Sequence, residues 1–190
     1  MTRWRHPGLA FIAAFLFAAL AIRALAADDG RFEIRNAYVE LVGDRWQLEV
    51  QLDLGLSEAA RQAFDEGVPL TLLLEAEATT RRRFLPDETV VSLSREWQLA
   101  YDAIADRHVV TDPESGERTS YASRDEALAA LARISALPLT DTAKLPPDGR
   151  FKMRVRASVE IGELPAAVKI LLFWKSWSRS TDWYVWSVRP

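Results

Sequence analysis

Residues 151–161 read FKMRVRASVEI, the longest uninterrupted strand pattern in the chain. Apolar side chains occupy every second position, and the residues between them are polar or charged. A period of two is typical of a β-strand that buries one face and exposes the other. Antiparallel sheets commonly have one buried and one solvated face, so this stretch predicts an antiparallel β protein.

The same alternation recurs along the chain. It is clear in 45–54 (RWQLEVQLDL), where Gly43-Asp44 provides a turn after a β-rich segment at 32–42. That segment loses its alternation near Asn36-Ala37, which predicts a β-bulge. In the expected strand at 90–102, Arg95 interrupts the row of apolar side chains. The remaining expected strands are 70–80, 90–102, 107–112 and 118–121, the last two joined by a turn at 113–116, and then 168–174 and 183–188.

Two segments predict short helices instead. Residues 57–66 (SEAARQAFDE) begin with a capping serine and end before Gly67. Ser123 and Glu126 form a capping box, and the apolar stripe behind them predicts a helix to about residue 135.

These segments predict a mainly β fold, α+β by content. We expect an antiparallel β-sandwich-like or curved sheet of about eight strands, with the two helices on its face or edge. An open barrel that holds an apolar ligand is the structural alternative.

The composition fits one packed domain with an added targeting segment. The chain has 190 residues, 49% of them hydrophobic, and a net charge of −3. It contains no cysteine, which excludes disulfides, thiolate zinc sites, iron–sulfur clusters and cysteine nucleophiles.

Residues 1–26 predict a secretory signal peptide. Basic residues precede the apolar run 9–22, and Ala24-Leu25-Ala26 supplies the small residues that precede cleavage. We expect cleavage after Ala26, export by the general secretory route and a single β-rich periplasmic domain at 27–190. Retention of residues 1–26 as an inner-membrane anchor is the alternative. Removing them takes away three arginines and no acid, which changes the net charge from −3 to −6 and disfavours nucleic-acid binding.

Two groups of basic residues are candidate binding sites. In Arg81-Arg82-Arg83, strand alternation places Arg81 and Arg83 on one face, where they could hold a phosphate, a lipid headgroup or an acidic partner. The alternative is simple pairing with nearby acids, which are Glu75, Glu77, Asp87 and Glu88.

The second basic group lies on the strand quoted above. Lys152, Arg154 and Arg156 form a row with a spacing of about 6.6 Å. An anionic ligand or membrane surface would meet this row. Its alternative role is cross-strand pairing, with Glu49 and Asp53 as the expected partners.

Aromatic residues crowd into the end of the chain. They are Trp174, Trp177, Trp183, Tyr184 and Trp186. Such a cluster could stack carbohydrate or bind an apolar partner, or it could close the core. Trp183 and Trp186 are three apart and must face opposite sides of a strand.

No catalytic or metal-binding constellation is visible. His108 would be the only histidine of the exported domain, and there is no G-x-S-x-G motif to hold a serine nucleophile. A pair of carboxylates is not marked by any spacing. We therefore expect no catalytic residue, no metal site and no cofactor.

Several longer segments resemble one family. They are GVPLTLLLEAE at 67–77, LAYDAIADRHVV at 99–110, SGERTSYASRDEALAAL at 115–131, RVRASVEIGELP at 154–165 and DWYVWSV at 182–188. In this order they resemble the exported proteobacterial family known as domain of unknown function 4390. The resemblance implies an N-terminal export segment and one compact domain, and it implies no site residues.

The sequence thus favours a non-catalytic periplasmic or envelope-associated binding domain. An envelope protein or a lipid is the expected partner, and contact with the membrane is expected only through an uncleaved N-terminal segment. A carrier of lipids or small apolar ligands is the first alternative. A hydrolase that uses His108 or a carboxylate pair is a less favoured alternative.

Overall fold

The computed structural model describes residues 30–139, 145, 150–161 and 179–188. Ten strands and two helices lie in this part of the chain. Their bounds are β1 (Phe32–Val42), β2 (Arg45–Leu54), α2 (Glu58–Asp65), β3 (Leu70–Thr80), β4 (Glu88–Asp102), β5 (Arg107–Thr111), β6 (Arg118–Tyr121), α3 (Arg124–Leu131), β7 (Arg133–Pro138), β8 (Phe151–Ile161), β9 (Arg179–Ser180) and β10 (Tyr184–Val188).

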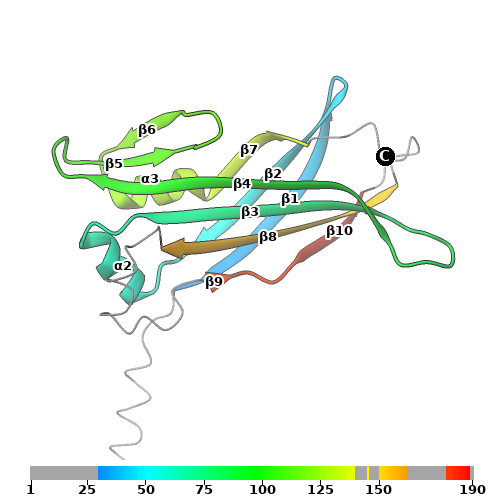
Figure 1. Ribbon diagram of the computed structural model, residues 1–190, viewed down its shortest axis with the longest axis horizontal. Coiled ribbons are helices and arrows are strands. Elements are labelled where there is room, and N and C mark those ends of the chain that lie inside the picture. The colour runs from blue at the N-terminus through cyan, green and yellow to red at the C-terminus, as the bar shows by residue number, and fades with distance from the viewer. Residues whose placement is uncertain (1–29, 140–144, 146–149, 162–178, 189–190) are drawn as a thin grey trace, which may run out of the picture.

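The strands form two antiparallel sheets that lie one behind the other (Figure 1). The larger sheet has seven strands in the order β10-β8-β3-β4-β5-β6, with β9 also paired to β8, and the smaller has the order β1-β2-β7. Within the described part of the chain, neither sheet closes on itself. The predicted mainly β, sandwich-like fold with two helices is therefore confirmed, and the barrel alternative is wrong.

Two neighbouring strands of the larger sheet, β3 and β8, supply most of its buried face. Along β3, five residues with alternating positions are buried, and they are Leu70, Leu72, Leu74, Ala76 and Ala78. Register pairs Ala76 with Val155 and Ala78 with Met153 on β8. The pattern at 151–161 therefore forms the expected half-buried strand, with Phe151, Met153 and Val155 inside.

The smaller sheet covers this inner face. Leu48 and Val50 of β2 are almost fully buried and join the core cluster of the larger sheet. Register shifts between Ile34 and Asn36 of β1, which confirms the predicted bulge. Trp46 meets the ring of Phe151 edge-on, with 5.4 Å between ring centroids.

The helices agree with the sequence at their starts. Ser57 caps α2 by accepting from the amide of Ala60 at 3.2 Å, and the helix bounds match the prediction. Ser123 caps α3 in the same way, by accepting from the amide of Glu126 at 3.2 Å. The Glu126 carboxylate accepts from the Ala122 amide rather than from the serine amide.

The predicted end of the second helix, near residue 135, is wrong. Helix α3 ends at Leu131, and residues 133–138 form β7 on the edge of β2. Ile134 and Leu137 are buried there, so pairing with β2 gives their side chains a place in the core that a longer helix would not. Ala136 adopts a positive φ of 54° at the irregular point of this strand.

The outer edge of the larger sheet is interrupted. Ser180 pairs with Ser158 and Tyr184 pairs with Val155, so three residues on the edge span two on β8. Thr181 lies in this interruption with 8% of its surface exposed. Its amide donates to the Ala157 carbonyl at 2.8 Å, and its hydroxyl accepts from the Ala157 amide at 3.1 Å.

In the described residues no helix is both long and apolar enough to cross a membrane. The expected signal peptide at 1–26 and the expected strand at 168–174 lie outside the described residues.

We predict that Thr181→Val lowers the free energy of unfolding by about 1–3 kcal/mol, because the buried Ala157 amide loses its acceptor. Thr71→Val is the matched control, since Thr71 lies half-exposed on β3 with no side-chain hydrogen bond inside the described ranges. Urea denaturation of both variants measures the difference. Equal stabilities for the two variants would contradict this role of Thr181.

Candidate functional site

A row of polar side chains crosses three neighbouring strands where the larger sheet ends. Register places Ser187 of β10 beside Lys152 of β8, and Lys152 beside Thr79 of β3. These positions alternate with the buried Phe151 and Val188, so the row faces away from the core. Two hydroxyl groups thereby flank one ammonium group on the same face.

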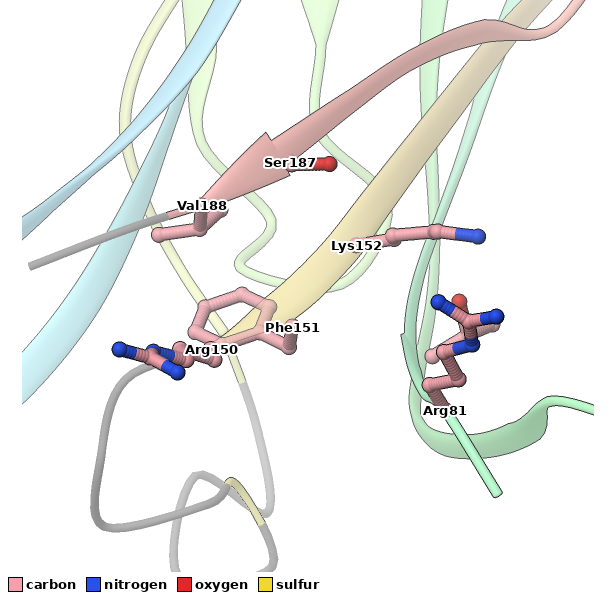
Figure 2. A pocket seen from close by; sticks show the side chains of 7 residues that line it. Arg81, Arg150, Phe151, Lys152, Ser187 and Val188 are labelled. Atoms are coloured by element: carbon pink, nitrogen blue, oxygen red, sulfur yellow. The ribbon is translucent and has the colours of Figure 1, made fainter. Parts of the chain in front are cut away.

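Two arginines complete this site. Arg81 follows β3 and Arg150 precedes β8, and both line a pocket of about 580 Å³ together with the row. Figure 2 shows Lys152 and Arg81 on one side of Phe151 and Arg150 on the other. We call the pocket formed by Thr79, Arg81, Arg150, Phe151, Lys152, Ser187 and Val188 the basic pocket.

Among the described residues, the ammonium group of Lys152 has one acidic neighbour. It donates to the carboxylate of Asp87 at 3.2 Å, and about half of the lysine side chain is exposed. An exposed pair of this kind contributes only about 0–1 kcal/mol, so a second anion can compete with Asp87 for Lys152. The arrangement offers cationic donors and hydroxyl groups to an anionic oxygen group such as a phosphate.

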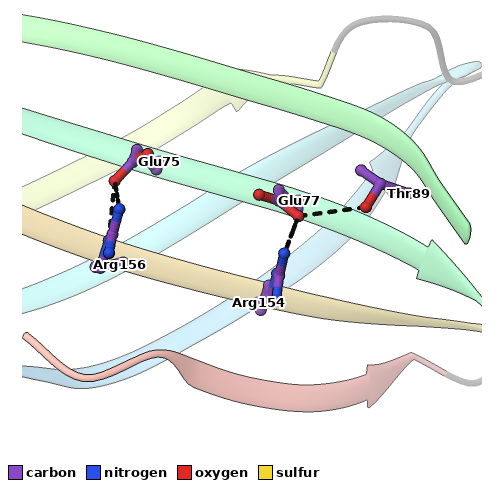
Figure 3. A network of polar contacts seen from close by, with 5 residues as sticks. All are labelled: Glu75, Glu77, Thr89, Arg154 and Arg156. Carbon is purple, nitrogen blue, oxygen red and sulfur yellow. Dashed lines mark hydrogen bonds and ion pairs between the residues drawn. The ribbon is translucent and has the colours of Figure 1, made fainter. Parts of the chain in front are cut away.

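The other two cations of the same strand have different partners. Arg154 donates through Nε and a terminal nitrogen to Glu77 at 2.9 and 2.5 Å, and Arg156 does the same to Glu75 (Figure 3). The Trp183 ring packs against both guanidinium groups, at 4.6 and 4.8 Å from its centroid. Cation–π contact and ion pairing therefore engage Arg154 and Arg156 within the fold.

The prediction that Lys152, Arg154 and Arg156 pair with Glu49 and Asp53 is wrong. Glu49 accepts from the amide of Ala136 at 2.6 Å, and Asp53 pairs with Arg35 at 2.6 Å, both on the smaller sheet. The two acids lie on the other layer because β2 pairs with β1 and β7, whereas β8 pairs with β3.

A comparison with family models gives one match. The model for a domain of unknown function, DUF4390, matches residues 29–187, which is most of the chain. This chain belongs to the DUF4390 family. The match confirms the family resemblance found in the sequence. No curated protein and no solved structure gives a match.

The terminal aromatic residues of this DUF4390 chain divide between the faces of the sheet. Trp183 covers the two arginines on the outer face, whereas Trp186 is half-buried against the core, as their spacing predicted. Tyr184 also packs against the core, and its ring lies 5.7 Å from that of Trp186. Trp174 and Trp177 lie outside the described residues.

His108 lies away from the basic pocket, between two aromatic rings. Its ring centroid is 5.6 Å from that of Phe64 and 5.2 Å from that of Tyr101. Its Nδ1 atom is buried and has no hydrogen-bond partner among the described residues. Within the same residues, no group of three histidine or acidic side chains could hold a metal ion.

The structure brings together residues that sequence reasoning had treated separately. Arg81 and Lys152 were candidates in different groups, and they line one pocket. Arg83 lies farther along the loop, with its guanidinium 5.6 Å from the Phe84 ring. Thr79, Arg150 and Ser187 were missed, because only strand register shows which residues of distant segments are neighbours.

A second pocket, of about 460 Å³, opens between β4, β5, α3 and β7. Arg95 lines it from the inner face of β4, where register places it beside Leu74. The guanidinium donates to Asp112 at 2.8 Å and also pairs with Glu114. These two acids explain why the apolar row of β4 tolerates an arginine. The guanidinium group is partly buried, and its charge is paired with carboxylates.

Asp112 also organises the turn between β5 and β6. Its Oδ1 accepts from the amides of Glu114 and Ser115 at 2.9 and 3.3 Å. Burial raises the pKa of Asp112, but these hydrogen bonds and the charge of Arg95 together outweigh burial and hold the pKa below its ordinary value of 3.8. The stability that Asp112 contributes is complete above this value and is lost as the pH falls through the lowered pKa.

We predict that Asp112→Ala lowers the free energy of unfolding by about 1–2 kcal/mol near neutral pH, since charge-assisted hydrogen bonds are lost. The difference from the unchanged protein should shrink as the pH falls from 3.8 through the lowered pKa of Asp112, because the folded protein then takes up the proton on this carboxylate. Urea denaturation across this pH range measures it. Glu96→Ala, which removes an exposed carboxylate on β4, is the control, and a pH-independent difference for Asp112→Ala would contradict the assignment.

Proposed function

We propose that this DUF4390 chain is an exported, non-catalytic binding domain that holds an anionic group of an envelope component in the basic pocket. The observation that carries the proposal is the row Thr79–Lys152–Ser187, with Arg81 and Arg150 beside it. Donors from three strands converge there on one face. A rigid sheet places them more precisely than a mobile loop would.

The chemistry of the pocket supports binding rather than turnover. Its polar residues are hydroxyl groups and cations, and among the described residues that line it there is no carboxylate or histidine that could serve as a general base. The exported domain would carry a net charge of −6, so the attraction of an anion would depend on the cations of the basic pocket and not on the overall charge.

Export is the second part of the proposal. It is supported by the pattern of residues 1–26, in which basic residues, a short apolar run and Ala24-Leu25-Ala26 follow one another. A periplasmic location would place the basic pocket among the phosphate-bearing molecules of the envelope.

We predict that inorganic phosphate binds the purified protein and shifts the backbone amide signals of Lys152 and Ser187 in NMR spectra. Arg81→Gln combined with Lys152→Gln should weaken this binding about tenfold or more, because charge-assisted hydrogen bonds are lost. Asp87→Asn should strengthen it, since the competing carboxylate is removed.

Arg118→Gln is the matched control for charge, because Arg118 is an exposed arginine on β6 at the other edge of the sheet. It should leave the phosphate affinity unchanged. The proposal is wrong if the double variant binds phosphate as tightly as the unchanged protein does.

We predict that the protein recovered from the envelope of an expressing bacterium begins at Ala27. Small residues at positions 24 and 26 are those that signal peptidase accepts. Mass spectrometry of the intact protein measures its N-terminus. A mass that includes Met1 would replace cleavage with the anchored alternative.

A further inference from the structure

The connection between β3 and β4 is an exposed tip with an unusual sequence. Residues 81–88 read RRRFLPDE; 81–87 join the two strands with the longest paired register among the described strands, and Glu88 begins β4. Figure 1 shows this hairpin projecting beyond the other strands of the sheet. We call residues 81–88 the arginine tip.

The arginine tip exposes two neighbouring apolar side chains. Phe84 is 89% exposed and Leu85 is 62% exposed, so neither packs against the core. Single exposed apolar residues are common on soluble proteins. Here the two are adjacent and lie at the projecting end of a hairpin, and Pro86 follows them and restricts the backbone.

The charge around this pair is positive. Residues 81–88 and 150–152 together contain five basic and two acidic side chains. Arg82 pairs with Glu88 and Lys152 with Asp87. Arg81 and Arg83 have no ion pair within the described ranges, and Arg83 instead lies over the Phe84 ring.

We infer that the arginine tip docks on an anionic phospholipid surface, with Phe84 and Leu85 inserted among the headgroups and acyl chains. Basic residues beside exposed apolar side chains are the pattern of peripheral membrane contacts. This inference rests on the proposed function, because the basic pocket beside the tip would take the phosphate of a headgroup. It adds a membrane contact to the sequence-based expectation, which placed such contact only in residues 1–26.

The shape of the tip favours a lipid surface over a folded acidic protein. A stable protein interface buries about 800 Å² on each partner, and two side chains on a narrow hairpin offer much less. A bilayer surface is fluid and closes around a narrow apolar projection, so it needs no complementary groove.

The test uses the absence of cysteine from the chain. Leu85→Cys introduces a single thiol, which is labelled with a nitrobenzoxadiazole group whose fluorescence rises and shifts to the blue in an apolar environment. Ile104→Cys is the matched control, because Ile104 is 100% exposed in the turn at the other end of β4, between Asp102 and Asp106. The full chain is used, because each label reports only its own surroundings.

We expect the label at 85 to respond to vesicles of phosphatidylglycerol mixed with phosphatidylcholine, and not to phosphatidylcholine alone. The label at 104 should respond to neither. Arg81→Gln with Arg83→Gln should weaken the response at 85 about tenfold or more, since arginines near an anionic surface add to the affinity. High salt should weaken it as well.

Phe84→Ser separates this inference from the proposed function. It should weaken vesicle binding by the labelled tip and leave the affinity for inorganic phosphate unchanged. No response at 85 with anionic vesicles, or equal responses at 85 and 104, overturns the lipid contact even if phosphate binds. A response at 85 to soluble polyglutamate but not to vesicles would replace the lipid with an acidic polypeptide and also overturn it.

Discussion

The inner faces of β3 and β8 must be kept from water, and the rest of the structure follows from this requirement. Ala76 and Ala78 of β3 lie beside Val155 and Met153 of β8, and all four are almost completely buried. Side chains alternate along a strand, so burying one set of residues turns the other set outward. The outward-facing row Thr79–Lys152–Ser187 of this DUF4390 chain is the consequence of that alternation.

Burial of the inner face of β8 turns its three cations outward, and their positions along the strand give them two different roles. Arg154 and Arg156 lie in the middle of the sheet, where Glu77 and Glu75 are neighbours on β3 and Trp183 covers them. Lys152 lies at the end of the sheet, where the neighbouring positions on β10 and β3 carry hydroxyl groups and Asp87 is its ion-pair partner. Position along one strand therefore separates cations that stabilise the sheet from the cation that faces a pocket.

Local patterns predicted most of the fold. Most of the described strands, the first hairpin, the bulge of β1 and the caps of both helices depend on residues close in sequence, such as Ser57 and Gly43. Strand β7 could not be predicted in this way, because Ile134 also fits the apolar stripe of a helix. Pairing with β2, which is distant in the sequence, makes this segment a strand. The same holds for the pairing of Arg154 and for the basic pocket, since both need the order of strands in space.

The edges of the two sheets share a property that bears on how copies of the chain behave together. Within the described ranges, β6 has only four residues, β1 is bulged, β7 ends in proline with a left-handed residue before it, and β9 and β10 are separated at Thr181. A long regular edge would accept a strand from another molecule and begin an aggregate. These features shorten the regular stretch of edge that each sheet offers to a strand of another molecule, and so they restrict such growth.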